Sequence, residues 1–387
     1  MAGADRPLAT PAAISFQGWC LALALSLGAA VSLGITRFAY GLLLPAMRTD
    51  LGWSYTLAGA MNTANALGYL IGALWAPRLL RTRGPGEVLW RGAVLASVFM
   101  GLSGFFTDTT ALLAQRLLAG VASALVFVAG GLLAARLGAR FPRHNGLLLG
   151  MYYGGTGVGI VLSALMVPWL LEAFAAQPHG WQWSWWALAL ACAVGTAVLV
   201  WPARVMSRWA LPGAPAGAGG PQQFHWRDFR FGLAGYTFFG VGYIGYMTFV
   251  VALLRSQGTS AAAVTVFYAL LGSAVIASSR IWAGLLDKHQ DGRPLATLNT
   301  LLGVAIVLPA LTQWWPALLA SGLLFGAVFL SVVASTTALV RHNLPPTAWA
   351  AGISAFTTVF AAGQIVGPTV VGWIADGPGG LARGLVR

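Results

Sequence analysis

Residues 110–135 read TALLAQRLLAGVASALVFVAGGLLAA and contain a single ionisable side chain, that of Arg116. An apolar stretch of about 20 residues is long enough to cross the hydrocarbon core of a bilayer as a helix. The whole chain has this character, because 58% of its 387 residues are hydrophobic and only 8% are charged. Soluble domains carry about a quarter charged residues. We therefore predict an all-α integral membrane protein whose surroundings are the lipid bilayer.

The same composition excludes several function classes. A chain with so few charges cannot cover itself with water-soluble surface, so a soluble enzyme is excluded. The net charge of +13 would suit a nucleic-acid-binding protein, but basic cytoplasmic loops are its usual cause in membrane proteins. We expect no nucleic-acid partner, no enzymatic activity, no cofactor and no metal, because no nucleotide loop, metal spacing or nucleophile constellation is present.

Hydropathy and loop signals predict eleven membrane-spanning helices. Only helices and closed barrels satisfy their backbone in lipid, and no strand alternation is visible. The eleven segments lie at about 17–46, 54–77, 87–106, 110–135, 145–170, 182–202, 229–253, 261–285, 295–313, 315–340 and 347–374.

The distribution of basic residues predicts the orientation. If the N-terminus is cytoplasmic, most of the 22 Lys and Arg residues fall in cytoplasmic loops. Cytoplasmic loops are enriched in Lys and Arg. We therefore expect a multi-pass protein of the bacterial cytoplasmic (inner) membrane with a cytoplasmic N-terminus.

A Pro/Gly-rich stretch divides the chain. Residues 211–221 read LPGAPAGAGGP, a composition typical of a flexible linker. We predict an N-terminal six-helix half at 1–203, a cytoplasmic linker at 204–227, and a C-terminal half with five helices at 228–387.

The two halves align as parallel repeats. A shift of about 206 residues superimposes several positions, among them Gly34 on Gly240, Tyr40 on Tyr246 and Gly120 on Gly326. In this register the partner of the sixth segment would begin near residue 389, so we expect that the last (twelfth) helix is missing from this sequence.

Four local motifs carry a resemblance to a known family. They are Leu112-x-x-x-Arg116-x-x-x-Gly120, the loop Ala283-Gly-Leu-Leu-Asp287-Lys288, the eleventh-segment Gly363-x-x-x-Gly367-Pro368, and Gly34-Ile-Thr-Arg37-Phe-Ala-Tyr40-Gly-Leu-Leu-Leu-Pro45. With the two parallel halves, the first two resemble signatures of the major facilitator superfamily of secondary transporters. The third is similar to a packing motif associated with antiporters. The fourth resembles the YbfB-like branch.

Three arginines lie inside predicted spans: Arg37, Arg116 and Arg280. Every acidic residue lies at a helix end or in a loop. A guanidinium cannot release its proton but binds carboxylate or phosphate strongly where water is scarce. We therefore predict that Arg37 contacts an anionic substrate, with Arg116 as a second candidate.

Structural alternatives stay open for each arginine. Arg37 could snorkel outward or pair with an acid such as Asp50. Arg116 could serve packing and backbone pairing, or by the resemblance could couple conformational change. Arg280, one turn from the end of its helix, could snorkel to the interface or pair with Asp287.

Polar side chains on the helical faces are candidates to complete the site. The substrate-binding candidates are Arg37, Tyr40, Asn62, Asn65, Tyr243, Tyr246 and Gln364. The candidates for coupling or conformational change are Arg116, Arg280, Asp287, Gly363, Gly367 and Pro368. Polar residues in membrane helices also serve as contacts between helices.

The resemblance implies a secondary active transporter that works by rocker-switch alternating access. From the buried arginines we expect its substrate to be a small organic anion or an amphiphilic metabolite. The alternatives are a multidrug or metabolite exporter coupled to protons and a non-transporting membrane scaffold. We expect a monomer, with the proton as a possible second substrate.

Overall fold

The computed structural model describes residues 15–141, 144–209, 224–345 and 349–386. These residues form helices and short connections, with no β-strand among them. The first half of the chain forms α1 (Phe16–Ala29), the π-helix η1 (Ala30–Ile35), α2 (Tyr40–Leu51), α3 (Tyr55–Arg83), α4 (Pro85–Ser103), α5 (Thr109–Arg140), α6 (Asn145–Ala173) and α7 (Gln182–Ser207). The second half forms α8 (Arg230–Ser256), α9 (Ala261–Ile281), α10 (Ala283–Lys288), α11 (Arg293–Leu311), α12 (Trp315–Asn343), α13 (Trp349–Asp376) and α14 (Gly380–Val386).

The all-α membrane class is confirmed. Within the described residues, nine helical stretches are long and apolar enough to cross a membrane, and α1, η1 and α2 together make one of them. Helices α3 and α4 occupy the predicted second and third segments but are not among the nine. Asn62 and Asn65 lower the hydropathy of α3, and both form hydrogen bonds to other helices. The predicted total of eleven spans stays a prediction.

Polar N-caps begin several of the helices. The hydroxyl of Ser54 accepts a hydrogen bond from the Leu57 amide at the start of α3, and Ser260 does the same for Ala263 in α9. At α5, the Asp108 carboxylate accepts from the Ala111 amide. Such caps satisfy amide groups that the first helical turn leaves free.

The predicted first span, 17–46, is not one continuous helix. The amide of Thr36 donates to the Val31 carbonyl at 3.1 Å and that of Phe38 to Leu33 at 3.0 Å, a five-residue spacing that marks a π-helical turn. The α-helix resumes at Tyr40, so residues 36–39 form a break in the middle of the span. Hydropathy could not reveal this break, because the residues on both sides are equally apolar.

Two other predicted boundaries differ from the structure. The predicted span 261–285 divides into α9 and α10, with Trp282 between them. Helix α7 continues to Ser207, past the predicted start of the linker at 204, and most of that linker (210–223) lies outside the described residues.

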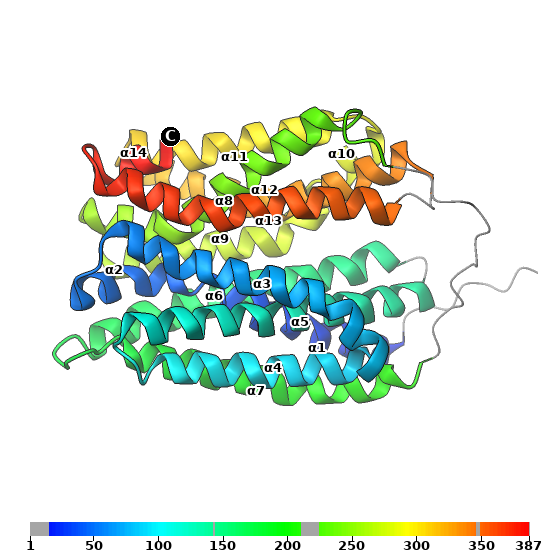
Figure 1. Ribbon diagram of the computed structural model, residues 1–387, viewed down its shortest axis with the longest axis horizontal. Coiled ribbons are helices and arrows are strands. Elements are labelled where there is room, and N and C mark those ends of the chain that lie inside the picture. The colour runs from blue at the N-terminus through cyan, green and yellow to red at the C-terminus, as the bar shows by residue number, and fades with distance from the viewer. Residues whose placement is uncertain (1–14, 142–143, 210–223, 346–348, 387) are drawn as a thin grey trace, which may run out of the picture.

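The halves pack side by side, with α1–α7 in the lower part of Figure 1 and α8–α14 in the upper part. Helix α3 packs on α13 and α6 packs on α9, and these two pairs join the halves. We call the end of the bundle where α7 ends and α8 begins the linker end, and the end where α2 leads into α3 the sealed end.

Contacts between α3 and α13 join the two halves at the sealed end. A Cβ added at Gly59 of α3 would overlap the Pro368 carbonyl oxygen of α13, so glycine is required there. The Asp376 carboxylate at the end of α13 accepts hydrogen bonds from the Tyr55 amide at 2.7 Å and the Thr56 amide at 2.9 Å. A carboxylate at a helix N-terminus is stabilised by the free amides and the helix dipole.

Candidate functional site

A cavity of about 1080 Å³ lies between the two halves. Its deep part is lined by residues near the break in the first span, including Leu33, Arg37 and Phe38. Its other lining residues include Gly146 and His342, which lie at the linker-end termini of α6 and α12. The cavity therefore opens toward the linker end and closes near the middle of the bundle.

The break in the first span places Arg37 at the deep end of this cavity. The side chain is 2% exposed, and its guanidinium donates a hydrogen bond to Oε1 of Gln364 on α13, in the other half. Nε of Arg37 is buried without a hydrogen-bond partner. The guanidinium carbon lies 5.4 Å from the centre of the Tyr69 ring. Arg37 thus has donor capacity that the protein leaves unused.

A second donor points at the same oxygen. The hydroxyl of Tyr243 on α8 donates to Gln364 Oε1 at 2.9 Å. Because a guanidinium only donates, the Gln364 carboxamide must present its oxygen to Arg37. Arg37 and Tyr243, from opposite halves, therefore converge on one acceptor, an arrangement that also suits a carboxylate oxygen.

The cavity carries positive charge without a matching acid. Arg37 and Arg280 are among its lining residues, and no Asp or Glu is among those that the structure describes. Asp50, which could have paired with Arg37, instead accepts from Trp181 Nε1 at 2.5 Å and contacts His179 Nδ1 at 2.6 Å. The charge of Arg37 therefore meets an amide dipole and not a carboxylate.

Aromatic rings form two walls of the cavity. In the second half, Phe239, Tyr243 and Phe360 lie with ring centroids 5.0–5.5 Å apart and planes within 11–19° of each other. The ring of Phe329 lies 6.0 Å from that of Tyr243 at 8°. The wall of the first half is formed by Tyr69, Phe127 and Tyr153.

Arg116 is equally buried, at 2% exposed, but does not line this cavity. Its guanidinium donates to the Thr36 carbonyl at 2.8 Å and to Asn62 Oδ1 at 2.9 Å. It also lies 5.0 Å from the centre of the Tyr40 ring. Arg116 therefore holds the break in the first span against α3 and α5.

Four predicted cavity residues lie in helix contacts away from the cavity. Each has a hydrogen-bond partner on another helix or segment. Asn62 Nδ2 donates to Thr248 Oγ1 at 2.7 Å, and Asn65 Nδ2 donates to the Arg116 carbonyl at 3.1 Å. The Tyr40 hydroxyl donates to the Ala58 carbonyl at 2.8 Å, and the Tyr246 hydroxyl lies 2.7 Å from Ser321 Oγ. Of the predicted set, the structure brings Arg37, Tyr243 and Gln364 together.

The predicted coupling residues are dispersed. Arg280 is exposed and lines the cavity toward its mouth, whereas the side chain of Asp287 lies outside the described residues. A Cβ at Gly363 or Gly367 would crowd the backbone of α8, at 2.6 Å and 2.7 Å from carbonyl oxygens. These glycines allow α8 and α13 to pack closely within one half, while Pro368 contacts α3 of the other half.

Sequence reasoning singled out Tyr243 but not the phenylalanines of the aromatic lining. Phe239 and Tyr243 are four residues apart on α8, a spacing that places them on one helical face. Phe329 and Phe360 lie far away in the sequence, so only the fold unites the wall. The Tyr268 hydroxyl donates to the Phe38 carbonyl at 2.9 Å and joins α9 to the break, a contact that the sequence did not predict.

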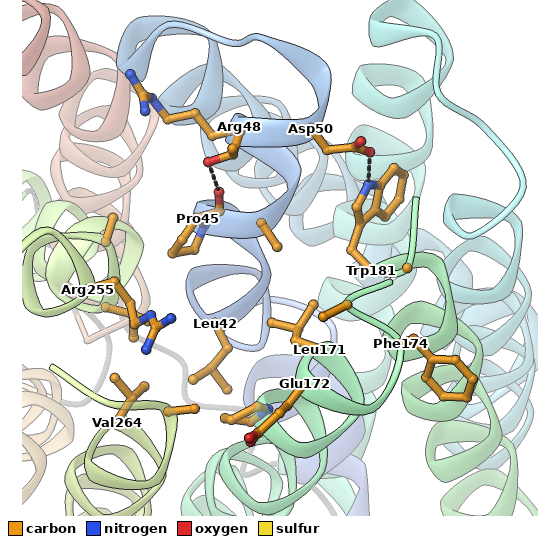
Figure 2. A pocket seen from close by; sticks show the side chains of 18 of the residues that line it. Leu42, Pro45, Arg48, Asp50, Leu171, Glu172, Phe174, Trp181, Arg255 and Val264 are labelled. Atoms are coloured by element: carbon orange, nitrogen blue, oxygen red, sulfur yellow. Dashed lines mark hydrogen bonds between the residues drawn. The ribbon is translucent and has the colours of Figure 1, made fainter. Parts of the chain in front are cut away.

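A second cavity, of about 970 Å³, lies at the sealed end among α2, α6, α8 and α9. Figure 2 shows the Asp50 carboxylate there against the Trp181 indole. Its lining includes both signs of charge, with Arg48 and Arg255 beside Asp50 and Glu172. Because these acids can offset its arginines, it makes a weaker candidate for an anion site than the central cavity.

The chain is similar in sequence to known transporters. The family described as "Uncharacterised MFS-type transporter YbfB" matches residues 29–386. Two Agrobacterium vitis proteins named "Putative tartrate transporter" are each 25% identical over 91% of this chain, and the matches cover 86% and 82% of those proteins.

Solved structures share the fold. The nucleoside transporter NupG has a TM-score of 0.68 at 12% identity, over 96% of this chain and 95% of that one. The xylose transporter XylE from E. coli has a TM-score of 0.69 at 14% identity, over 96% and 94%. The chain belongs to the YbfB family of major-facilitator-type transporters.

Proposed function

We propose that this protein is a secondary transporter that carries a small organic anion across the cytoplasmic membrane. The observation that supports this most is the state of Arg37, whose buried positive charge faces a cavity and has no carboxylate partner among the described residues, only the Gln364 amide oxygen and the Tyr69 ring. An ionised group inside a membrane protein is costly unless a partner or water compensates it. An anion in the cavity supplies that compensation.

Gln364 Oε1 occupies the position that we assign to a substrate oxygen. It accepts from both Arg37 and Tyr243, the donors that an anionic oxygen would use. Charge-assisted hydrogen bonds are about twice as strong as neutral ones. A substrate carboxylate therefore competes well with the neutral amide for both donors.

Alternating access requires that the two ends of the bundle open in turn. The central cavity opens at the linker end, while α3 and α13 meet at the sealed end. With the orientation predicted from the basic loops, this is an inward-open state. We propose that rocking of the halves exposes Arg37 to the other side.

The relatives' name fits the anion class. Tartrate is an organic anion, and the A. vitis proteins carry that name at 25% identity. For this chain, the proposal of an anionic substrate rests on the charge of Arg37 in the cavity and not on the name of the A. vitis proteins.

A proton-coupled exporter of hydrophobic compounds is the second candidate, and the aromatic walls favour it. Phe239, Phe329 and Phe360 would suit an amphiphilic compound. A cationic drug, however, would meet Arg37 without any acid among the described lining residues. The favoured substrate is therefore negatively charged even if part of it is apolar.

Transport by purified protein in liposomes tests the proposal. We expect accumulation of labelled carboxylates that Arg37→Gln abolishes and Arg37→Lys restores in part, because lysine keeps the charge but not the fork geometry. Arg91→Gln is the matched control, since Arg91 pairs with Glu87 in an exposed position away from the cavity. Carboxylate transport by Arg37→Gln at the wild-type rate would rule the proposal out.

A further inference from the structure

We propose that the substrate is a monocarboxylate whose body is a flat aromatic ring system. This inference rests on the proposed function, because it assumes that Arg37 binds the anionic end. It goes further by naming the number of charges and the shape of the rest of the molecule.

The cavity offers one deep cation. Tyr268 of α9 lies beside Phe38, because its hydroxyl donates to the Phe38 carbonyl. Arg280 follows Tyr268 by twelve residues on the same helix. At a rise of about 1.5 Å per residue, Arg280 lies about 18 Å further along the bundle. This separation of the two backbone levels leads us to expect that a small molecule bound at Arg37 does not reach Arg280.

His342 does not supply the second charge either. It follows Phe329 by thirteen residues on α12, which places it about 20 Å closer to the mouth. A short dicarboxylate bound at Arg37 would therefore leave its second carboxylate beside aromatic rings and hydroxyls such as that of Ser331, without a second cation among the described lining residues at that depth. Burial of an unpaired carboxylate is strongly unfavourable, so the deep site selects a single negative charge.

The walls beside Arg37 suit a flat apolar body. Phe239, Tyr243 and Phe360 present nearly parallel rings on one side, at interplanar angles of 11–19°. Tyr69 and Phe127 lie on the other side. Among the described ring contacts, none joins these two sets. We expect a planar ring to fit between these walls better than a saturated ring of similar size, because aromatic rings gain energy from contact with one another beyond the area they bury.

In the cavity, the hydrogen-bond donors lie directly next to the aromatic wall, as the carboxylate and ring of an aromatic acid lie next to each other. The hydroxyl of Tyr243 belongs to the donor pair that meets Gln364, and its ring belongs to the wall. A carboxylate held by Arg37 and Tyr243 would therefore have its attached ring beside Phe239 and Phe360.

The test is a binding series on wild-type protein in liposomes: benzoate, cyclohexanecarboxylate and tartrate, each as competitor of labelled benzoate. Benzoate and cyclohexanecarboxylate share charge and size but differ in planarity. We expect benzoate to bind between about two- and tenfold more tightly than cyclohexanecarboxylate, the range of one aromatic contact. Tartrate should bind most weakly. Equal binding of the two monocarboxylates would overturn the inference.

Matched variants test whether the aromatic walls cause the preference for a planar ring. Phe360→Leu and Phe239→Leu should reduce the preference for the flat ring, whereas Phe249→Leu should retain it. Phe249 is a buried residue of α8 whose ring lies 6.1 Å from that of Tyr55, and neither residue lines the central cavity. A preference that survives both cavity variants would contradict the assigned walls.

The outcomes separate this inference from the proposed function. Arg37-dependent binding that is tighter for tartrate than for benzoate would overturn the aromatic monocarboxylate and leave the anion transporter standing. Binding of all three acids that is unaffected by Arg37→Gln would overturn both.

Discussion

Arg37 and Arg116 are two buried guanidiniums, each 2% exposed, with opposite surroundings. Arg116 donates to the Thr36 carbonyl and to Asn62 within its own half of the protein. Arg37 reaches across the cavity to the other half and leaves Nε without a partner. A buried charge is therefore not by itself a sign of substrate binding. Nε lacks a partner in Arg116 as well, so what distinguishes Arg37 is that its unused donor lies beside a cavity.

The largest expected effect is that of Arg37→Gln on substrate binding. Removal of one partner of a buried charge pair costs about 2–5 kcal/mol, so apparent affinity for a carboxylate should fall at least about 30-fold. Thermal stability without substrate should change little, because Arg37 has one hydrogen bond to lose. Equilibrium binding and detergent melting curves measure the two. A large loss of stability would place Arg37 in the same structural class as Arg116.

Gln364→Glu should produce the next largest effect. The new carboxylate would occupy the site between Arg37 and Tyr243 and neutralise the guanidinium permanently. We expect anion transport to fall about tenfold or more, since the substrate must displace a charged group. Gln364→Ala is the control, because it removes the competitor and should keep or improve binding. Unchanged transport by Gln364→Glu would show that Gln364 does not stand at the substrate position.

Arg116→Gln should act on stability first. It breaks hydrogen bonds to Thr36 and Asn62, and each contact of this kind within a membrane contributes about 0.6–1.7 kcal/mol. We expect destabilisation of about 1–3 kcal/mol, measured by unfolding in denaturant. Substrate affinity of the folded fraction should remain close to that of wild type. A selective loss of affinity at unchanged stability would move Arg116 into the substrate site.

Asp376→Ala tests the sealed end and should have a smaller effect. It removes the hydrogen bonds to the Tyr55 and Thr56 amides that cap α3. Loss of a cap costs about 1 kcal/mol, which would raise the population open at the sealed end about fivefold. Spin labels on exposed Thr49 and Ser256, on opposite halves, report that population as a longer distance. No change in the distance distribution would mean that Asp376 does not hold the seal.

Arg280→Gln should produce the smallest effect. Arg280 is exposed near the mouth and about 18 Å from the deep site by helical rise. A charge at a rim changes association rates more than affinity, and salt screens it. We expect about a twofold slower uptake at low ionic strength that disappears at high salt. A salt-independent loss would indicate direct contact with the substrate.

The class of fold could be predicted from the sequence because each span is a long apolar stretch, and its hydropathy can be seen in consecutive residues without knowledge of the packing. The same holds for the position of Arg37 within the first span. The π-helix at 30–35 and the break at 36–39 could not be predicted, since the apolar stretch continues on both sides of them. They depend on partners from other helices, such as Arg116 and Tyr268.

The candidate site could be predicted only in part. Arg37, Tyr243 and Gln364 share the property of polar groups on apolar helices, and so do Asn62 and Tyr246. The difference is made by neighbours: Thr248 and Arg116 bond to Asn62, and Ser321 to Tyr246. Such pairing depends on how the helices pack, and the spacing of residues along the sequence carries no information about that packing.

The most direct test of the central claim is a structure determined with a bound aromatic carboxylate such as benzoate. We expect the carboxylate within hydrogen-bond distance of Arg37 and Tyr243, with the Gln364 amide turned away from both. An anion bound instead at the mouth near Arg280, with Arg37 still donating to Gln364, would contradict the claim.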